Sequence, residues 1–132
     1  MHLAEKVEFC GPIGGDQVPE VVTDFDVFVN LLAKGGAGKA VLEAMSMKVP
    51  TLICTTAFDP FLTKEDRDVL VFRPDDPESL KHKIVGVMNS CEEDRSRMGE
   101  RLRELVVRQH SLGNLAGKIK AIFQNLQKNM GR

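Results

Sequence analysis

The stretch that decides the fold is KGGAGKAVLEAM, residues 34–45. An apolar run at residues 27–32 precedes it, and a second apolar run at residues 51–54 follows it. Short apolar runs bounded by Gly and Pro predict buried strands. The order strand, glycine loop, helix and strand predicts a parallel βαβ unit.

The glycine loop has the composition of an anion site. Gly36 and Gly38 let a ligand approach the backbone without meeting a Cβ. A helix that begins near Ala37 points unpaired N–H groups and the positive end of its dipole at the same space, beside Lys39. Such a helix start suits a phosphate or diphosphate. Glu43, about two turns further on, leans back toward the helix start and could accept hydrogen bonds from ribose hydroxyls.

A structural interpretation of the same residues stays open. The glycines would then form only a tight turn, and Glu43 would pair with Lys39 as an i, i+4 ion pair.

The rest of the chain extends the pattern to an α/β fold. Strands are expected at residues 7–10, 26–32, 51–55 and 69–72, and helices are expected to start near Gln17, Asp76, Glu92 and Ser111. The prediction is a single domain over residues 1–132, with a parallel Rossmann-like sheet of about four strands, flanking helices and a helical C-terminus. Ligands of such sheets bind beyond the carboxyl ends of the strands.

Composition excludes several classes of function. The formal net charge of the 132 residues is −1, which favours no nucleic-acid partner, although residues 95–132 hold nine Lys or Arg and two acids. The cysteines, Cys10, Cys54 and Cys91, have no zinc-ligand spacing, so no metal site is expected. Absence of a disulfide framework fits a cytoplasmic protein.

Four segments resemble the nucleotide-sugar glycosyltransferases of the GT-B fold, and most closely the family called glycosyltransferase group 1. They are VEFCG at residues 7–11, DVFV at 26–29, LEAMSMKVPT at 42–51 and RPDDPESL at 73–80. Their order and spacing match the family across nearly the whole chain. The resemblance implies the donor-binding half of a two-domain enzyme, which holds a UDP-, GDP- or ADP-linked sugar without metal or other cofactor.

The resemblance also implies roles for single residues. Glu43 matches the family glutamate that binds the donor ribose. Gly36 and Gly38 match the glycines that face the phosphates and sugar, with Ala37 and Lys39 in the same loop, and Gly11 matches the glycine near the base. Two residues depart from the family. Gly35 stands where the family has a glutamate that contacts the donor sugar, and Ala37 stands where an aromatic residue is usual. No catalytic residue is assigned.

The resemblance further implies parts of the enzyme outside this chain. The family's donor half begins with two more strands, and its acceptor domain is a separate unit, so the chain alone is expected to be inactive. Without those strands, residues 26–32 are expected to have an open apolar edge, which pairs either with residues 7–10 or with a second chain as a homodimer. Within a larger enzyme, a peripheral location at the membrane is an additional expectation.

Two other functions remain as alternatives. Residues 34–39 also resemble the deviant Walker A loop of partition-type ATPases, in which Lys39 would hold phosphates. The next residue in that loop offers a hydroxyl to Mg²⁺, and here it is Ala40. A non-enzymatic α/β interaction domain is the third hypothesis. Nucleotide binding without metal indicates a transferase, and ATP binding that requires Mg²⁺ indicates an ATPase.

Overall fold

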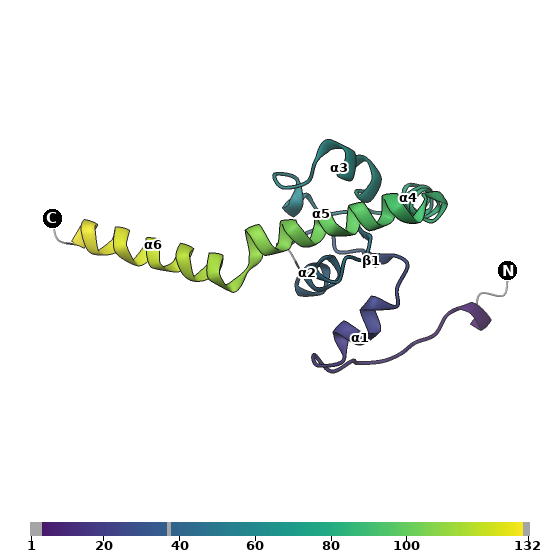
Figure 1. The fold of residues 1–132 in the computed structure, drawn as a ribbon, viewed down its shortest axis with the longest axis horizontal. Helices are drawn as coiled ribbons and strands as arrows, with labels where there is room; N and C mark the ends of the chain where they lie inside the picture. Colours follow the sequence, from purple (N-terminus) through teal and green to yellow (C-terminus); the bar gives the residue numbers. More distant parts are fainter. Residues whose placement is uncertain (1–3, 37, 131–132) are drawn as a thin grey trace.

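The computed structural model describes residues 4–36 and 38–130, and it shows a small parallel sheet with helices around it (Figure 1). In chain order the elements are η1 (Ala4–Lys6), α1 (Val18–Thr23), β1 (Phe28–Asn30), α2 (Lys39–Ser46), β2 (Thr51–Ile53), η2 (Thr56–Phe58), α3 (Lys64–Leu70), α4 (Pro77–Asn89), α5 (Glu92–His110) and α6 (Leu112–Met130). The mixed α/β class is confirmed.

The sheet is smaller than the sequence predicts. β1 and β2 pair in parallel, with Val29 opposite Leu52. In place of the strand expected at residues 69–72, α3 continues to Leu70, and a single parallel bridge joins Val71 to Ile53. The N–H of Phe72 donates to the carbonyl oxygen of Ile53 at 3.0 Å. The chain therefore runs beside β2 where a third strand is expected, but it pairs with β2 through a single bridge and forms no strand.

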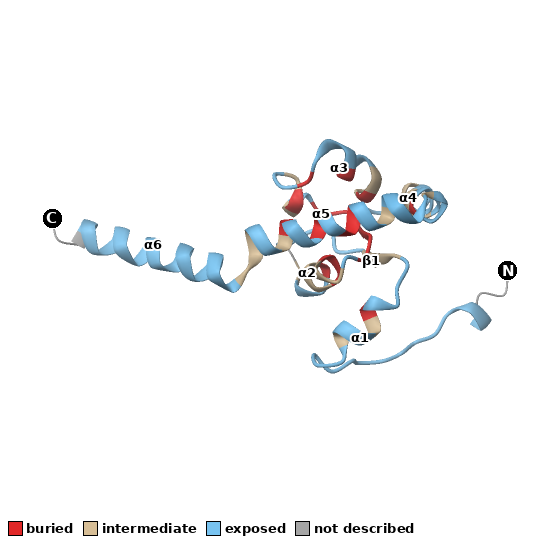
Figure 2. Ribbon diagram, in the orientation of Figure 1, coloured by how far each residue is buried: buried red, intermediate tan, exposed pale blue. Residues whose placement is uncertain are grey.

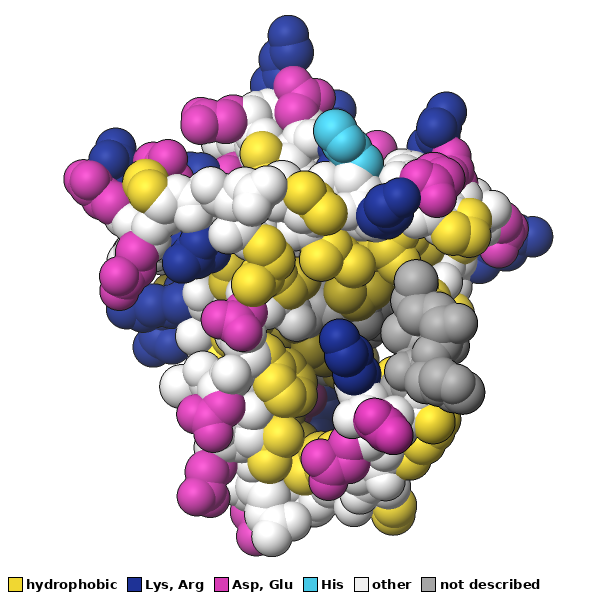
Figure 3. Space-filling view, turned by 90° about the vertical axis from the view of Figure 1, so that its right-hand side faces the viewer, with side chains coloured by type: hydrophobic (Ala, Val, Ile, Leu, Met, Phe, Trp, Pro, Cys, Tyr) yellow, Lys and Arg dark blue, Asp and Glu magenta, His cyan; other side chains and the backbone are white. Residues whose placement is uncertain are grey.

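The strand expected at residues 7–10 does not form. Residues 4–17 are exposed throughout, and the side chain of Phe9 is 95% exposed. Figure 3 shows the molecule from the side on which the N-terminus lies in Figure 1. Hydrophobic side chains gather across the middle of this face, beside a hollow. The expectation that residues 7–10 pair with β1 is wrong, because β1 pairs only with β2 among the described residues. The outer edge of β1 is consequently open.

The helix starts follow the sequence signals. The side chain of Asp76 accepts a hydrogen bond from the N–H of Ser79 at 2.9 Å, and Pro77 is the first residue of α4, as its fixed φ favours. Ser111 caps α6 through the N–H of Asn114 at 3.3 Å. Both helices therefore start where the sequence predicts. Among the helices in the described ranges, none has the length and apolarity needed to cross a bilayer.

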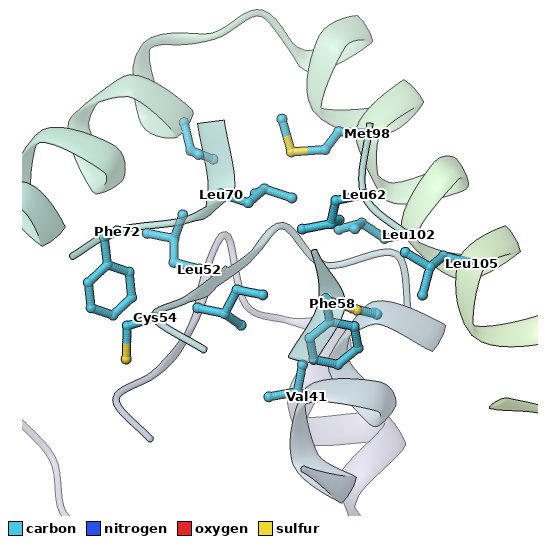
Figure 4. Close-up of a cluster of buried hydrophobic side chains, with 13 residues drawn as sticks. Val41, Leu52, Cys54, Phe58, Leu62, Leu70, Phe72, Met98, Leu102 and Leu105 are labelled. Atoms are coloured by element: carbon cyan, nitrogen blue, oxygen red, sulfur yellow. The ribbon is translucent and has the colours of Figure 1, made fainter. Parts of the chain in front are cut away.

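The core lies between the sheet and the helices α2, α4 and α5 (Figures 2 and 4). β2 is its centre, because Thr51, Leu52 and Ile53 are all fully buried. Both faces of this strand are therefore covered, whereas β1, whose composition predicts the same, is only half-buried. The main buried cluster comprises Val41, Met45, Leu52, Ile53, Cys54, Phe58, Leu62, Leu70, Phe72, Val87, Met98, Leu102 and Leu105. A smaller cluster of Val22, Ala44 and Val49 joins α1 to α2.

Helices α2 and α5 meet at a glycine. Gly99 is buried in α5, and a Cβ at that position would overlap the backbone carbonyl of Lys48, just beyond α2. Lys48 has a left-handed φ of 64°, and its Nζ lies 2.5 Å from Oε1 of Glu100. Gly99 thus permits close packing of the two elements. From the sequence alone, a glycine at this position indicates only a local loss of helix stability.

Candidate functional site

The glycine loop leaves the carboxyl end of β1 and leads into α2. The side chain of Asn30 accepts a hydrogen bond from the N–H of Leu32 at 2.8 Å, which turns the chain out of the strand. Gly38 is the N-cap of α2 in extended conformation, and its carbonyl accepts the first helical hydrogen bond, from Leu42, at 3.1 Å. Among the described residues, no side chain caps this end. The N–H groups of the first turn of α2 are therefore available to an anion.

Among the described glycines of the loop, backbone conformation requires glycine at one position, and neither conformation nor packing requires it at the other two. Gly35 has a φ of +127°, a conformation that side chains disfavour, so the backbone explains it. Gly36 and Gly38 have no such φ, and a Cβ on either would meet no atom closer than 4.0 Å. Local packing does not require glycine at these two positions. Glycine leaves the space in front of the backbone open at these positions, so a ligand can approach the backbone closely.

Glu43 lies on α2 and forms an ion pair with Lys39. The distance from Nζ of Lys39 to Oε1 of Glu43 is 3.2 Å, and the two side chains are 83% and 27% exposed. This contact is the i, i+4 pair of the structural interpretation. Because Lys39 is so exposed, the pair contributes little energy and can separate when a ligand competes for the carboxylate.

A cavity of about 380 Å³ lies at the same end of the sheet. Its walls come from residues directly after β1, β2 and the bridge, namely Leu31, Cys54 and Phe72, with residues 75–77 and Leu80 completing them. Cys54 and Phe72 lie side by side at one end of the buried cluster in Figure 4. The cavity therefore occupies the position at which open α/β sheets bind ligands.

Cys54 joins the two strand ends within this wall. Its thiol donates to the carbonyl oxygen of Asn30 at 3.7 Å. Burial raises the pKa of the Cys54 thiol, and the negative charge of Asp75 raises it further. The thiol is consequently neutral at physiological pH and serves as a small apolar wall.

Sequence reasoning missed the cavity residues Cys54, Phe72 and Asp75. Asp75 has a left-handed φ of 57° and lies in the turn before the N-cap Asp76, whose Oδ2 is 2.7 Å from Nη2 of Arg73. The signal available was positional, since Cys54 and Phe72 lie at the carboxyl ends of the strands expected at residues 51–55 and 69–72.

The site residues expected from sequence are only partly brought together. Gly36, Gly38, Lys39 and Glu43 share the loop and the first turns of α2. Ala37 lies outside the described residues. Gly11 belongs to the exposed segment of residues 4–17, which packs into neither buried cluster, and it has a left-handed φ of 68°. The structure thus gives Gly11 a left-handed backbone conformation in a segment apart from the core.

A larger cavity than the one at the end of the sheet lies elsewhere in the described part of the chain. It measures about 490 Å³ and is bounded by α3, α4 and α5. On its wall, Arg101 donates to the buried carboxylate of Asp66 through Nε at 3.0 Å and Nη2 at 2.6 Å. Hydrogen bonding to Asp66 raises the pKa of Arg101. The charges of Asp66 and Arg101 therefore already satisfy each other.

The described residues contain no group of three or more His, Cys, Asp or Glu side chains placed to hold a metal ion. At the start of α2 an anion would meet the backbone amides of the first turn, and the exposed Lys39 is in that turn.

Comparison with known proteins gives one match. The family model described as glycosyl transferases group 1 matches residues 1–90, which include the glycine loop, α2 and the cavity residues. Searches of curated proteins and of solved structures give no match. The family match spans more than half of the 132 residues. The chain therefore belongs to the group 1 glycosyltransferase family.

Proposed function

We propose that this chain binds the nucleoside diphosphate of a UDP-, GDP- or ADP-linked sugar and takes part in transfer of that sugar to an acceptor. In this proposal it is a donor-binding domain of the GT-B type, and the acceptor is held by a further domain or subunit. The observation that carries the proposal is the family match over residues 1–90, within which the uncapped start of α2 faces open space.

The diphosphate is placed at the first turn of α2. The free N–H groups there and the helix dipole favour negative charge, and Gly36 and Gly38 admit the phosphates to the backbone. During transfer, the bond between the sugar and the diphosphate breaks, and negative charge grows on the leaving diphosphate. Backbone dipoles fixed at that point stabilise this charge without the help of a metal.

Glu43 is assigned to the ribose. Its carboxylate can exchange the exposed Lys39 ammonium for two ribose hydroxyls, which would donate to its oxygens. The apolar wall formed by Leu31, Cys54 and Phe72 offers contact to the less polar part of the donor. Both contacts lie at the carboxyl end of the sheet, on the chain segments that follow β1 and β2.

The ATPase alternative has two lysines in its favour, Lys34 and Lys39, and one residue against it, Ala40, which cannot coordinate Mg²⁺. Calorimetric titration of the purified chain with UDP, GDP and ADP in the presence of EDTA, and with ATP plus Mg²⁺, separates the two. Binding of one diphosphate with EDTA present is expected. Binding restricted to ATP with Mg²⁺ would contradict the transferase proposal.

A further inference from the structure

Helix α6 projects from the body of the molecule and is exposed along its length (Figures 1 and 2). None of residues 112–129 is buried, and none belongs to either hydrophobic cluster. Six large apolar side chains on the helix are between 45% and 85% exposed: Leu112, Leu115, Ile119, Ile122, Phe123 and Leu126. An uncovered apolar face of this size indicates a binding surface.

The six side chains form one continuous stripe. At 3.6 residues per turn they fall within an arc of about 100°. An isolated helix of this length is marginally stable in water, and Gly113 and Gly117 weaken it further. A partner that covers the stripe would therefore stabilise the helix as well as bind it.

The charges on α6 have one sign. Lys118, Lys120 and Lys128 are its only charged residues, so the helix carries no acid. Helical geometry places Lys118 beside one border of the stripe and Lys120 beside the other, with Lys128 on the opposite face. Lysines in the border positions can extend toward anionic groups while the apolar side chains insert between them.

We propose that α6 lies on the surface of an anionic lipid bilayer, with its apolar stripe inserted and Lys118 and Lys120 at the headgroups. Charge complementarity favours this partner. A second copy of α6 would bring the same lysines against each other along the edges of the shared stripe, with no acid on the helix to neutralise them. An anionic headgroup layer supplies negative charge on both sides of the stripe at once.

Sedimentation with vesicles tests the proposal on the full chain. Vesicles of phosphatidylcholine and phosphatidylglycerol at a ratio of about three to one are expected to bind the chain, and vesicles of phosphatidylcholine alone are expected to bind it at least tenfold more weakly. Binding should fall as salt is raised toward 0.5 M (about 4 Å Debye length). Helicity measured by circular dichroism should rise on binding.

Matched variants identify the surface. Lys118→Gln combined with Lys120→Gln should weaken binding roughly thirtyfold, whereas Lys128→Gln on the far face should change it little. Ile122→Ser with Phe123→Ser should abolish binding, and Ala121→Ser is its control. Equal binding to both kinds of vesicle, or no effect of the border lysines, would overturn the proposal. Dimerisation through the stripe without vesicle binding would overturn it too.

Discussion

At the scale of single residues, Glu43 separates a ribose contact from a purely structural ion pair. In Glu43→Gln, the affinity for the nucleoside diphosphate is expected to fall by about 1–3 kcal/mol, because a charge-assisted hydrogen bond is weakened. The melting temperature should barely change, since the pair with Lys39 is exposed. Calorimetry and thermal unfolding measure the two effects. Lost stability with unchanged affinity would show that Glu43 is structural.

Lys39 provides the companion variant. Lys39→Ala should change diphosphate affinity by no more than about 0.5 kcal/mol, because backbone amides and the helix dipole hold the anion. Glu78→Gln, in an exposed pair with Lys81 on α4, is the control and should leave affinity unchanged. A severe loss of affinity in Lys39→Ala would instead favour an ATPase-type loop.

The reactivity of the Cys54 thiol measures how well the cavity wall is buried. Cys10 and Cys91 are exposed and should react quickly with Ellman's reagent at pH 8, whereas buried Cys54 should react on the order of a hundredfold more slowly until the chain unfolds. Its folded pKa is raised, so its contribution to stability is complete below the unfolded thiol pKa of about 8.5 and is lost as pH rises through the folded value. Equal reactivity of all three thiols would contradict this packing.

At the scale of elements, the contact between α2 and α5 depends on Gly99. Gly99→Ala is expected to lower the free energy of unfolding by about 1–3 kcal/mol, because its methyl group would overlap the carbonyl of Lys48. Gly86→Ala, in α4, meets no atom within 4 Å and should raise it by about 0.5–1 kcal/mol. Urea unfolding measures both. A stabilised Gly99→Ala variant would show that the two elements are further apart.

The elements also show what a sequence can and cannot predict. Local signals were sufficient at Asp76 and Ser111, where a cap and its helix are neighbours in the chain. Strand pairing is not local. The apolar composition of residues 7–10 does not determine a partner, and residues 69–70 complete α3 because a short apolar run fits a helix as well as a strand. Gly99 and the cavity beside Cys54 depend on contacts between distant segments, which spacing alone does not indicate.

At the scale of the whole molecule, the body is expected to fold without α6. Truncation after Ser111 should change the free energy of unfolding by less than about 0.5 kcal/mol, because α6 contributes no side chain to either cluster. Leu105→Ala, in the buried part of α5, should lower it by about 2–4 kcal/mol. Loss of cooperative unfolding in the truncated chain would contradict the separation of α6 from the body.

Where on the chain the nucleotide binds can be measured directly by NMR. Two-dimensional ¹H–¹⁵N spectra of the full chain, recorded during titration with UDP, GDP and ADP in EDTA, follow every backbone amide. One nucleotide is expected to shift the amides of Gly36, Gly38, Lys39 and Ala40 most, at the start of α2. Shifts confined to the cavity between α3, α4 and α5, near Lys83 and Arg101, or no shifts with any of the three, would contradict it.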